Sequence, residues 1–360
     1  MTDALIERWV NAQVRALTAY SVPDAAGLIK LDAMENPYTW PMALRTEWLE
    51  RLRHVEINRY PDPAARALTE RLHRYLALNE KVRLLLGNGS DELIQIIALA
   101  LRGEGRVLLA PEPTFVMYRM VAEVLGQRFV GVPLNAGDFS LDLPAMLAAI
   151  KAHEPAIVFL ACPNNPTGNL FERRDVELII ESAPGLVVID EAYFPFARET
   201  WLYDLPHHPN LVVLQTLSKV GLAGLRVGML AGAPAWCDEF NKIRLPYNIN
   251  TLSQVSAAFI LEHADLLDEQ AAQITHDREE LTAQLRALPD LKVWPSRANF
   301  VLFRVAHARE VYASLKQGGV LIRRLDNAHP LLADCLRVSI GTPAENTAFL
   351  NALRTTLKNA

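Results

Sequence analysis

The sequence has little cysteine, no excess of basic charge and no long apolar run, and each absence excludes a class of protein. The three cysteines, Cys162, Cys237 and Cys335, are odd in number and follow no metal-ligand spacing, so we expect a reducing, cytoplasmic compartment. Lys and Arg number 36 against 41 Asp and Glu, a formal net charge of −5. This balance gives no electrostatic support for a nucleic-acid or anionic-membrane partner.

The most apolar stretches, such as residues 93–101 and 211–214, are short. A bilayer span needs about 20 consecutive apolar residues, so no membrane anchor is expected. The N-terminus carries Asp3, Glu7 and Arg8 where a secretory signal has an apolar region. With 51% hydrophobic and 21% charged residues, the 360-residue chain has the composition of a folded globular protein, and its length favours two domains.

From about residue 81, short runs rich in Val, Ile and Leu alternate with longer segments of helical spacing. The runs predict strands at residues 82–86, 106–110, 156–161, 186–189, 211–215 and 227–230. Helices are predicted at residues 91–101, 114–125, 143–151 and 172–181. Continuous apolar strands separated by helices are typical of a largely parallel sheet covered on both faces. Ligands of such sheets bind beyond the carboxyl ends of the strands.

The character of the sequence changes after about residue 252. Residues 253–288 are charged and rich in Ala and Leu, which predicts one or two amphipathic helices. Strands at 299–303, 320–323 and 335–340 and helices at 308–317 and from 344 follow. We therefore predict an α/β protein with an N-terminal arm containing one short helix (1–45), a large domain (46–255) and a smaller α+β domain (256–360).

One acidic and one basic side chain, Asp190 and Lys219, follow predicted core strands. Asp190 comes after four apolar residues; it either caps the next helix or is a buried carboxylate that holds a cation. Lys219 follows another apolar strand and precedes a Gly-rich segment. Most lysines are solvated, but a lysine in a partly desolvated pocket has a lowered pKa and becomes a nucleophile able to form a Schiff base.

Two turn-forming segments follow other strands of the same sheet. Residues 162–168 read Cys-Pro-Asn-Asn-Pro-Thr-Gly, typical of turns, yet the Asn165 side chain could donate to a ligand oxygen. Gly89 and Ser90 stand at a helix start, where free amides attract phosphate. Asp91 and Glu92 would repel a phosphate unless their side chains point away, and the segment is not a Walker loop.

Together these segments converge on one sheet edge and supply the groups that pyridoxal phosphate requires. The groups are a phosphate cradle (Gly89, Ser90, Ser218, Arg226), a ring-nitrogen partner (Asp190), a donor pair for the ring oxygen (Asn165, Tyr193) and an aldehyde-binding amine (Lys219).

On these motifs the sequence resembles the fold-type I pyridoxal-phosphate aminotransferases, over nearly the whole chain and in the same order. The superfamily set is Asn165-Pro-Thr-Gly168, Asp190-x-x-Tyr193 and Ser218-Lys219. Arg59-Tyr-Pro-Asp-Pro63, Gly87-Asn-Gly-Ser-Asp-Glu92 and Leu222-Ala-Gly-Leu-Arg226 are similar to the branch that acts on histidinol phosphate. The resemblance implies a seven-stranded sheet and transamination between L-histidinol phosphate and 2-oxoglutarate in histidine biosynthesis.

The resemblance also implies a role for each site residue. Lys219 bonds to the cofactor and moves the substrate proton, and Asp190 keeps the ring nitrogen protonated. The other implied cofactor contacts are Tyr193 and Asn165 to the ring oxygen, Phe115 on the ring face, and Gly89, Ser90, Asp91, Ser218 and Arg226 to the phosphate. Tyr60 reaches the cofactor phosphate of a neighbouring subunit, which implies a homodimer. Substrate contacts are implied for Arg337, which binds either a carboxylate or a phosphate, and for Arg323, Tyr20 and Asn36.

Three positions depart from the family pattern or stay open. Lys219 and Arg226 are separated by seven steps, one fewer than in many members, which leaves the placement of Arg226 on the phosphate open. Met34 stands where an asparagine often precedes Glu35. Alternation along the strand does not decide between Arg323 and Arg324.

Other functions are compatible with parts of the pattern. A phosphothreonine decarboxylase or an aromatic amino acid aminotransferase of the same fold would share most cofactor residues. A cofactor-binding sensor module of a transcription regulator is the alternative from another class, but it predicts an N-terminal DNA-binding domain and a basic face, which the sequence lacks. No metal site is expected, because no second ligand pair accompanies His153 and Glu154.

Overall fold

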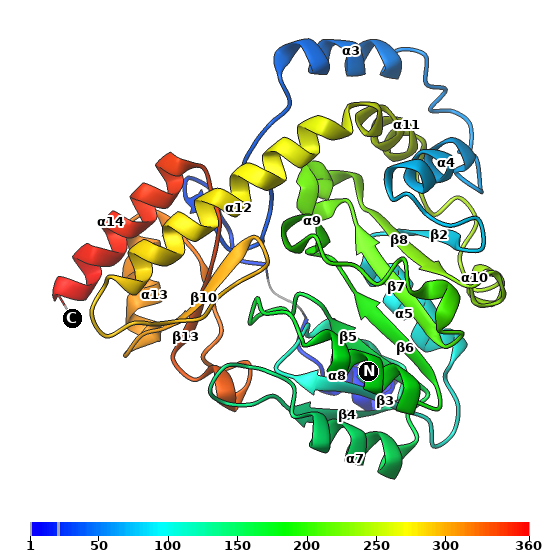
Figure 1. Ribbon diagram of the computed structural model, residues 1–360, viewed down its shortest axis with the longest axis horizontal. Coiled ribbons are helices and arrows are strands. Elements are labelled where there is room, and N and C mark those ends of the chain that lie inside the picture. The colour runs from blue at the N-terminus through cyan, green and yellow to red at the C-terminus, as the bar shows by residue number, and fades with distance from the viewer. Residues whose placement is uncertain (1, 20–21, 360) are drawn as a thin grey trace.

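A seven-stranded sheet of order β2-β8-β7-β6-β5-β3-β4 forms the centre of the larger part of the computed structural model, which describes residues 2–19 and 22–359 (Figure 1). Its strands are β2 (Arg83–Asn88), β3 (Val107–Glu112), β4 (Arg128–Pro133), β5 (Ile157–Ala161), β6 (Leu186–Asp190), β7 (Leu211–Thr216) and β8 (Val227–Gly232). β8 runs antiparallel to its neighbours β2 and β7, and the other pairs are parallel. The predicted fold class is confirmed.

The six predicted strands are present within a few residues, and β4 is the one that the pattern missed. β4 is an edge strand whose residues are mostly half-exposed, and it contains Gly131 and ends at Pro133. Gly and Pro weaken a strand signal and are tolerated at sheet edges. β5, β6 and β7 are buried at every position, which is why they read as continuous apolar runs.

Helices cover both faces of this sheet. One face packs against α5 (Ser90–Ala100), α6 (Met117–Val124) and α10 (Pro234–Asn241). The other packs against α4 (Arg66–Tyr75), α7 (Leu143–His153), α8 (Arg173–Ser182) and α11 (Thr251–Ile260). Successive residues of β5 alternate between the two cores, so that Phe159 joins the first and Val158 the second.

The smaller part is built on a four-stranded antiparallel sheet of order β12-β13-β10-β9. Its elements are β9 (Lys292–Val293), β10 (Phe300–Arg304), β12 (Arg323–Arg324), β13 (Cys335–Ser339), α12 (Ala264–Arg286), α13 (Ala308–Gln317) and α14 (Pro343–Asn359). Figure 1 shows α12 running from α11, beside the large sheet, to α14. The predicted strand 320–323 is split: β11 (Val320–Leu321) pairs with β1 (Ile29–Lys30), and β12 pairs with β13.

The N-terminal region holds more structure than the single short helix predicted for it. α1 (Thr2–Trp9) and α2 (Ala12–Ala16) precede β1, and α3 (Met42–Leu52) begins before residue 45. The short element α9 (Phe194–Ala197) and the single-turn helices Leu205–His207, Ala223–Leu225, Leu261–His263 and Pro330–Leu332 complete the fold. The domain bounds at 45 and 255 stay predictions.

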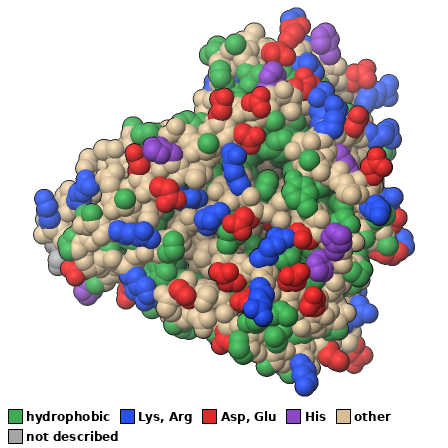
Figure 2. Space-filling view, in the orientation of Figure 1, with side chains coloured by type: hydrophobic (Ala, Val, Ile, Leu, Met, Phe, Trp, Pro, Cys, Tyr) green, Lys and Arg blue, Asp and Glu red, His purple; other side chains and the backbone are tan. Residues whose placement is uncertain are grey.

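Within the described part of the chain, no helix is both long and apolar enough to cross a bilayer. Lys and Arg side chains are interspersed with Asp and Glu over the face in Figure 2.

Candidate active site

A cavity of about 230 Å³ lies at the carboxyl ends of β5, β6 and β7, and we call it the inner cavity. Nine of the side chains predicted for the site line it: Ser90, Asp91, Phe115, Asn165, Asp190, Tyr193, Ser218, Lys219 and Arg226. Residues 33–35, from the N-terminal segment, close another side. Parallel strands end at the same sheet edge, and this geometry brings together side chains that lie far apart in sequence.

Asp190 is the last residue of β6 and is buried. Its Oδ2 accepts a hydrogen bond from the Tyr118 hydroxyl at 2.8 Å, and its Oδ1 accepts one from the Ala192 N–H at 3.1 Å. Burial raises the pKa of Asp190 to about 6, although both hydrogen bonds oppose the rise. A cation next to this carboxylate would remove the cost of burying its charge.

Tyr118 is a site residue that the sequence reasoning missed. It lies on α6, is fully buried, and its ring stacks on Phe159 with centroids 4.5 Å apart. It also contacts the edge of Phe115, at 5.6 Å. Phe115 lies just before α6 begins at Met117, and Tyr118 gives no signal of its own, because an aromatic residue in an apolar pattern is indistinguishable from ordinary core.

Lys219 lies in a π-helical turn, Ser218–Leu222, directly after β7. Its Nζ is 3.5 Å from the Ala33 carbonyl oxygen and 5.8 Å from the centroid of the Tyr193 ring. Burial, followed by the charge of Arg337, lowers the pKa of Lys219 to about 8. A larger fraction of its amine is therefore neutral and nucleophilic near neutral pH than in a solvated lysine.

Asn165 links the seven-stranded sheet of the larger part to the four-stranded sheet of the smaller part. Its Nδ2 donates to the Tyr193 hydroxyl at 3.1 Å, and its Oδ1 accepts from Nη1 of Arg337. Arg337 belongs to β13, is 6% exposed, and donates through Nη2 to the Asp32 carbonyl oxygen at 3.1 Å. The buried guanidinium is thus oriented by both parts of the protein.

The N-terminus of α5 forms a cradle with Arg226. Gly89 has φ +81°, and a Cβ there would overlap Nη2 of Arg226. The same nitrogen lies 3.3 Å from Oδ2 of Asp91. The shortened spacing from Lys219 is accommodated by the π-helical turn, the turn Ala223–Leu225 and a left-handed Arg226 (φ 53°). The guanidinium therefore lies beside Gly89 at the start of α5, where free amides attract a phosphate, and it pairs with the Asp91 carboxylate that would otherwise repel one.

A second cavity of about 370 Å³ adjoins the first, and we call it the outer cavity. Arg323 and Arg337 both line it, and they are direct partners in the β12–β13 register. Arg324 forms an ion pair with Asp326 at 2.9 Å and lies over the Tyr312 ring instead. The structure therefore places Arg323 rather than Arg324 beside Arg337.

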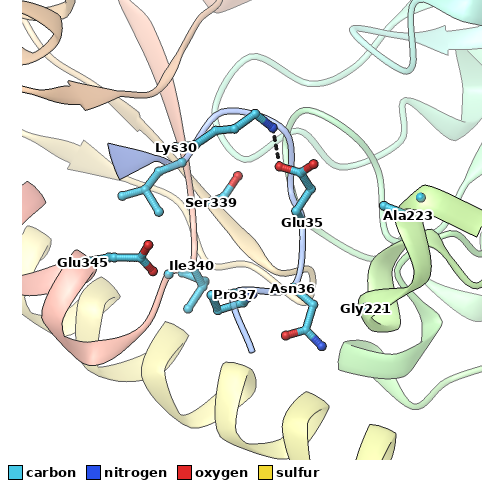
Figure 3. Close-up of a pocket in the computed structure, with 12 residues that line it drawn as sticks. Lys30, Glu35, Asn36, Pro37, Gly221, Ala223, Ser339, Ile340 and Glu345 are labelled. Atoms are coloured by element: carbon cyan, nitrogen blue, oxygen red, sulfur yellow. Dashed lines mark hydrogen bonds and ion pairs between the residues drawn. The ribbon is translucent and has the colours of Figure 1, made fainter. Parts of the chain in front are cut away.

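Besides Gly89, which borders Arg226, two described residues predicted for the site, Asn36 and Tyr60, line neither cavity. Asn36 donates through Nδ2 to Gln270 at 2.8 Å and to the Val220 carbonyl oxygen at 3.2 Å, and it lines a separate cavity of about 270 Å³ (Figure 3). Tyr60 is 81% exposed and stacks on Tyr247, with centroids 4.5 Å apart. Tyr20 lies outside the described residues.

The chain is similar to known proteins over nearly its whole length. The family model for aminotransferase class I and II matches residues 26–353. Histidinol-phosphate aminotransferase 2 of Nitrosococcus oceani is 55% identical over 361 residues, covering 100% of both chains. Histidinol-phosphate aminotransferase 2 of Cupriavidus pinatubonensis is 50% identical, covering 99% of this chain and 98% of its own. The crystal structure of histidinol-phosphate aminotransferase from Sinorhizobium meliloti, in complex with pyridoxal-5'-phosphate, shares the fold (TM-score 0.87, 24% identity, 98% of both chains).

Proposed function

The chain belongs to the aminotransferase class I and II family, and from this premise we propose that it transfers an amino group between L-histidinol phosphate and 2-oxoglutarate. The products are imidazole-acetol phosphate and glutamate, and the reaction belongs to histidine biosynthesis. The family membership confirms the resemblance drawn from the motifs. The full-length relatives that are 55% and 50% identical both carry the name of this activity.

The residues of the inner cavity fit pyridoxal phosphate. The inner cavity leaves room beside the buried Asp190 carboxylate for a protonated ring nitrogen. The amides at the start of α5, together with Arg226, provide the hydrogen-bond donors that a phosphate needs. When bound, the cofactor supplies an aldehyde and an electron-withdrawing ring. Asn165 and Tyr193 would orient the ring through its oxygen, Phe115 would pack on its face, and Ser218 would donate to the phosphate.

Lys219 is the amine in position to bind the aldehyde and then to move a proton. Its Nζ points into the inner cavity near Tyr193 and the Ala33 carbonyl oxygen. Because its pKa is lowered to about 8, Nζ can take up the proton from the amine-bearing carbon of the substrate near neutral pH.

The outer cavity supports an anionic substrate. Arg323 and Arg337 line it together, and a guanidinium binds phosphate or carboxylate in the same bidentate geometry. One site could therefore hold the phosphate of histidinol phosphate in one half-reaction and a carboxylate of glutamate in the other. The proposal rests on one observation: the inner cavity, which contains Lys219, Asp190 and Arg226, adjoins the outer cavity, which contains two arginines.

A homodimer in the cytoplasm is part of the proposal. Tyr60 and Tyr247 are exposed, and exposed apolar side chains lie in the neighbouring segments: Met42, Leu49, Ile57, Leu245 and Leu252. A second copy covering this face would bury them, and the Tyr60 hydroxyl would then reach the partner's cofactor phosphate. Replacing Tyr60 by Phe would weaken cofactor binding in a dimer and leave it unchanged in a monomer.

The half-reaction tests the proposed function directly. Adding histidinol phosphate to the cofactor-loaded protein is expected to convert the cofactor spectrum to that of its amine form, and the Lys219→Ala variant is expected to show no turnover. A kcat/KM for phenylalanine above that for histidinol phosphate would instead favour the aromatic aminotransferase. Release of CO₂ from phosphothreonine without histidinol phosphate turnover would favour the decarboxylase.

A further inference from the structure

Residues 32–36, which we call the strap, cross the site between the side chains of Lys219 and Arg337. The carbonyl oxygen of Asp32 accepts from Nη2 of Arg337 at 3.1 Å. The next carbonyl oxygen, that of Ala33, lies 3.5 Å from Nζ of Lys219. A segment whose backbone contacts both cations is fixed relative to the reacting atoms.

The strap is held by contacts of its own side chains. Figure 3 shows the Lys30–Glu35 ion pair and Asn36 pointing toward the helix below it. Asn36 bonds to Gln270 of α12 and to the Val220 carbonyl oxygen. The Asn36 contacts therefore position the strap from outside the inner cavity, whereas Glu35 also lines that cavity.

Met34 is the strap residue with the most constrained backbone. Its φ is +54°, a left-handed conformation that is uncommon for a non-glycine residue. Its N–H donates to Oγ of Ser339 at 2.8 Å, and its carbonyl oxygen accepts from Nδ2 of Asn299 at 2.9 Å. Hydrogen bonds on both sides of the Cα fix the direction of the side chain, and backbone strain of this kind is concentrated at functional sites.

Met34 lies at the junction of the two cavities, and it also packs against the apolar core of the smaller part. Met34, Phe115 and Asn165 are the lining residues that the inner and outer cavities share among the described part of the chain. We call these three residues the neck. In the proposed function Phe115 and Asn165 hold the cofactor ring, so the third wall of the neck remains for the substrate.

We propose that Met34 is a specificity-determining residue that packs against the imidazole-bearing part of the substrate as it spans the neck. This inference rests on the proposed function. A thioether is apolar and polarisable and makes favourable contacts with aromatic rings. A thioether makes no comparably favourable contact with the side-chain carboxylate of glutamate. Met34 therefore favours the ring-bearing donor, while Arg323 and Arg337 serve both substrates.

Two variants separate the side chain from the backbone. Met34→Gly keeps a left-handed φ readily and removes the apolar wall, whereas Met34→Leu keeps an apolar side chain of similar volume. In the Gly variant, kcat/KM for histidinol phosphate is expected to fall about tenfold, and that for glutamate less than about threefold. The Leu variant is expected to recover most of the lost preference.

Two binding measurements complete the test. Calorimetric titration of borohydride-reduced holoenzyme with histidinol phosphate is expected to show the same loss of affinity, and titration of apoprotein with cofactor is expected to show unchanged affinity. An unchanged substrate preference in the Gly variant, or a tenfold loss of cofactor affinity, would overturn the role of Met34. If the wild-type protein does not turn over histidinol phosphate, the proposed function itself fails, and this inference fails with it.

Discussion

The inner and outer cavities differ in how the chain builds them. Most of the inner cavity comes from residues that follow β5, β6 and β7 and from the start of α5, all on one rigid sheet. The outer cavity combines residues 112–119, the strap, and β12 with β13 of the other sheet. The residues proposed to bind the cofactor are therefore positioned by local sequence motifs. The residues proposed to select the substrate are positioned by the packing of the two parts of the protein against each other.

The same contrast occurs between two adjacent carboxylates. Asp190 faces the inner cavity and accepts two hydrogen bonds. Glu191 is also buried, but it accepts hydrogen bonds from Thr200, from the Trp201 N–H and from Gln215. The two residues are neighbours in sequence but face different surroundings. In the proposed function Asp190 takes part in the chemistry, whereas Glu191 holds neighbouring segments together.

The largest expected effect on turnover comes from exchanging the Asp190 carboxylate for an amide. Asp190→Asn is expected to lower kcat about 10²- to 10³-fold, because the charge that keeps the ring nitrogen protonated is lost. Glu191→Gln is the matched control, with an expected kcat within about threefold of wild type. Steady-state turnover of both variants measures the difference, and equal losses would show that the two carboxylates do not have separate roles.

The outer cavity is tested by a pair of neighbouring arginines. Arg337→Ala removes a buried guanidinium that both parts of the protein orient, so kcat/KM for histidinol phosphate is expected to fall about 10²-fold. Arg324→Ala, which removes the arginine that pairs with Asp326, is expected to change it less than about twofold. If the Arg324 variant loses more activity than an Arg323→Ala variant, the assignment of β12 to the cavity is wrong.

Tyr118 is tested through pH. Its hydrogen bond lowers the pKa of Asp190, so Tyr118→Phe is expected to raise that pKa above its wild-type value of about 6. As the pH falls, Asp190 then becomes protonated earlier, and cofactor affinity of the apoprotein is expected to decline at a higher pH than in wild type. Turnover near neutral pH should fall only about five- to tenfold.

Tyr75→Phe provides the control for this experiment. Burial raises the pKa of Tyr75 to about 12, but the hydrogen bonds to the Asp190 carboxylate in the described structure come from Tyr118 and from the Ala192 N–H. An identical pH profile for the Tyr118 variant and wild type would remove Tyr118 from the site.

The smallest expected effect is on stability. Burial raises the pKa of Glu191 from 4.5 to about 7, so the folded apoprotein binds this proton more tightly than the unfolded chain. Its contribution is fully present below about pH 4.5 and is lost as the pH rises toward 7. Glu191→Gln is expected to reduce the fall in unfolding free energy between pH 5 and pH 7.5 by about 1–3 kcal/mol. Urea unfolding at both pH values measures it, and an unchanged fall would contradict the assignment.

Some site residues can be predicted from the sequence, and others depend on packing that the sequence pattern does not show. Asp190, Ser218 and Lys219 directly follow apolar strands, so their meeting at one sheet edge could be predicted from pattern alone. Tyr118 could not, because an aromatic residue on an apolar helix face has the signature of core. The choice of Arg323 over Arg324 depends on Ile322, where the chain passes from one sheet to another. The position of Asn36 outside the two cavities depends on its hydrogen bond to Gln270 of α12, which the sequence pattern does not show.

Mapping the lysine that holds the cofactor tests the central claim most directly. Reducing the cofactor-loaded protein with borohydride, digesting it and sequencing the labelled peptide by mass spectrometry identifies that lysine. We expect the label on Lys219 alone, in near-stoichiometric yield. A label on another lysine, or none on Lys219 with excess cofactor present, would contradict the account.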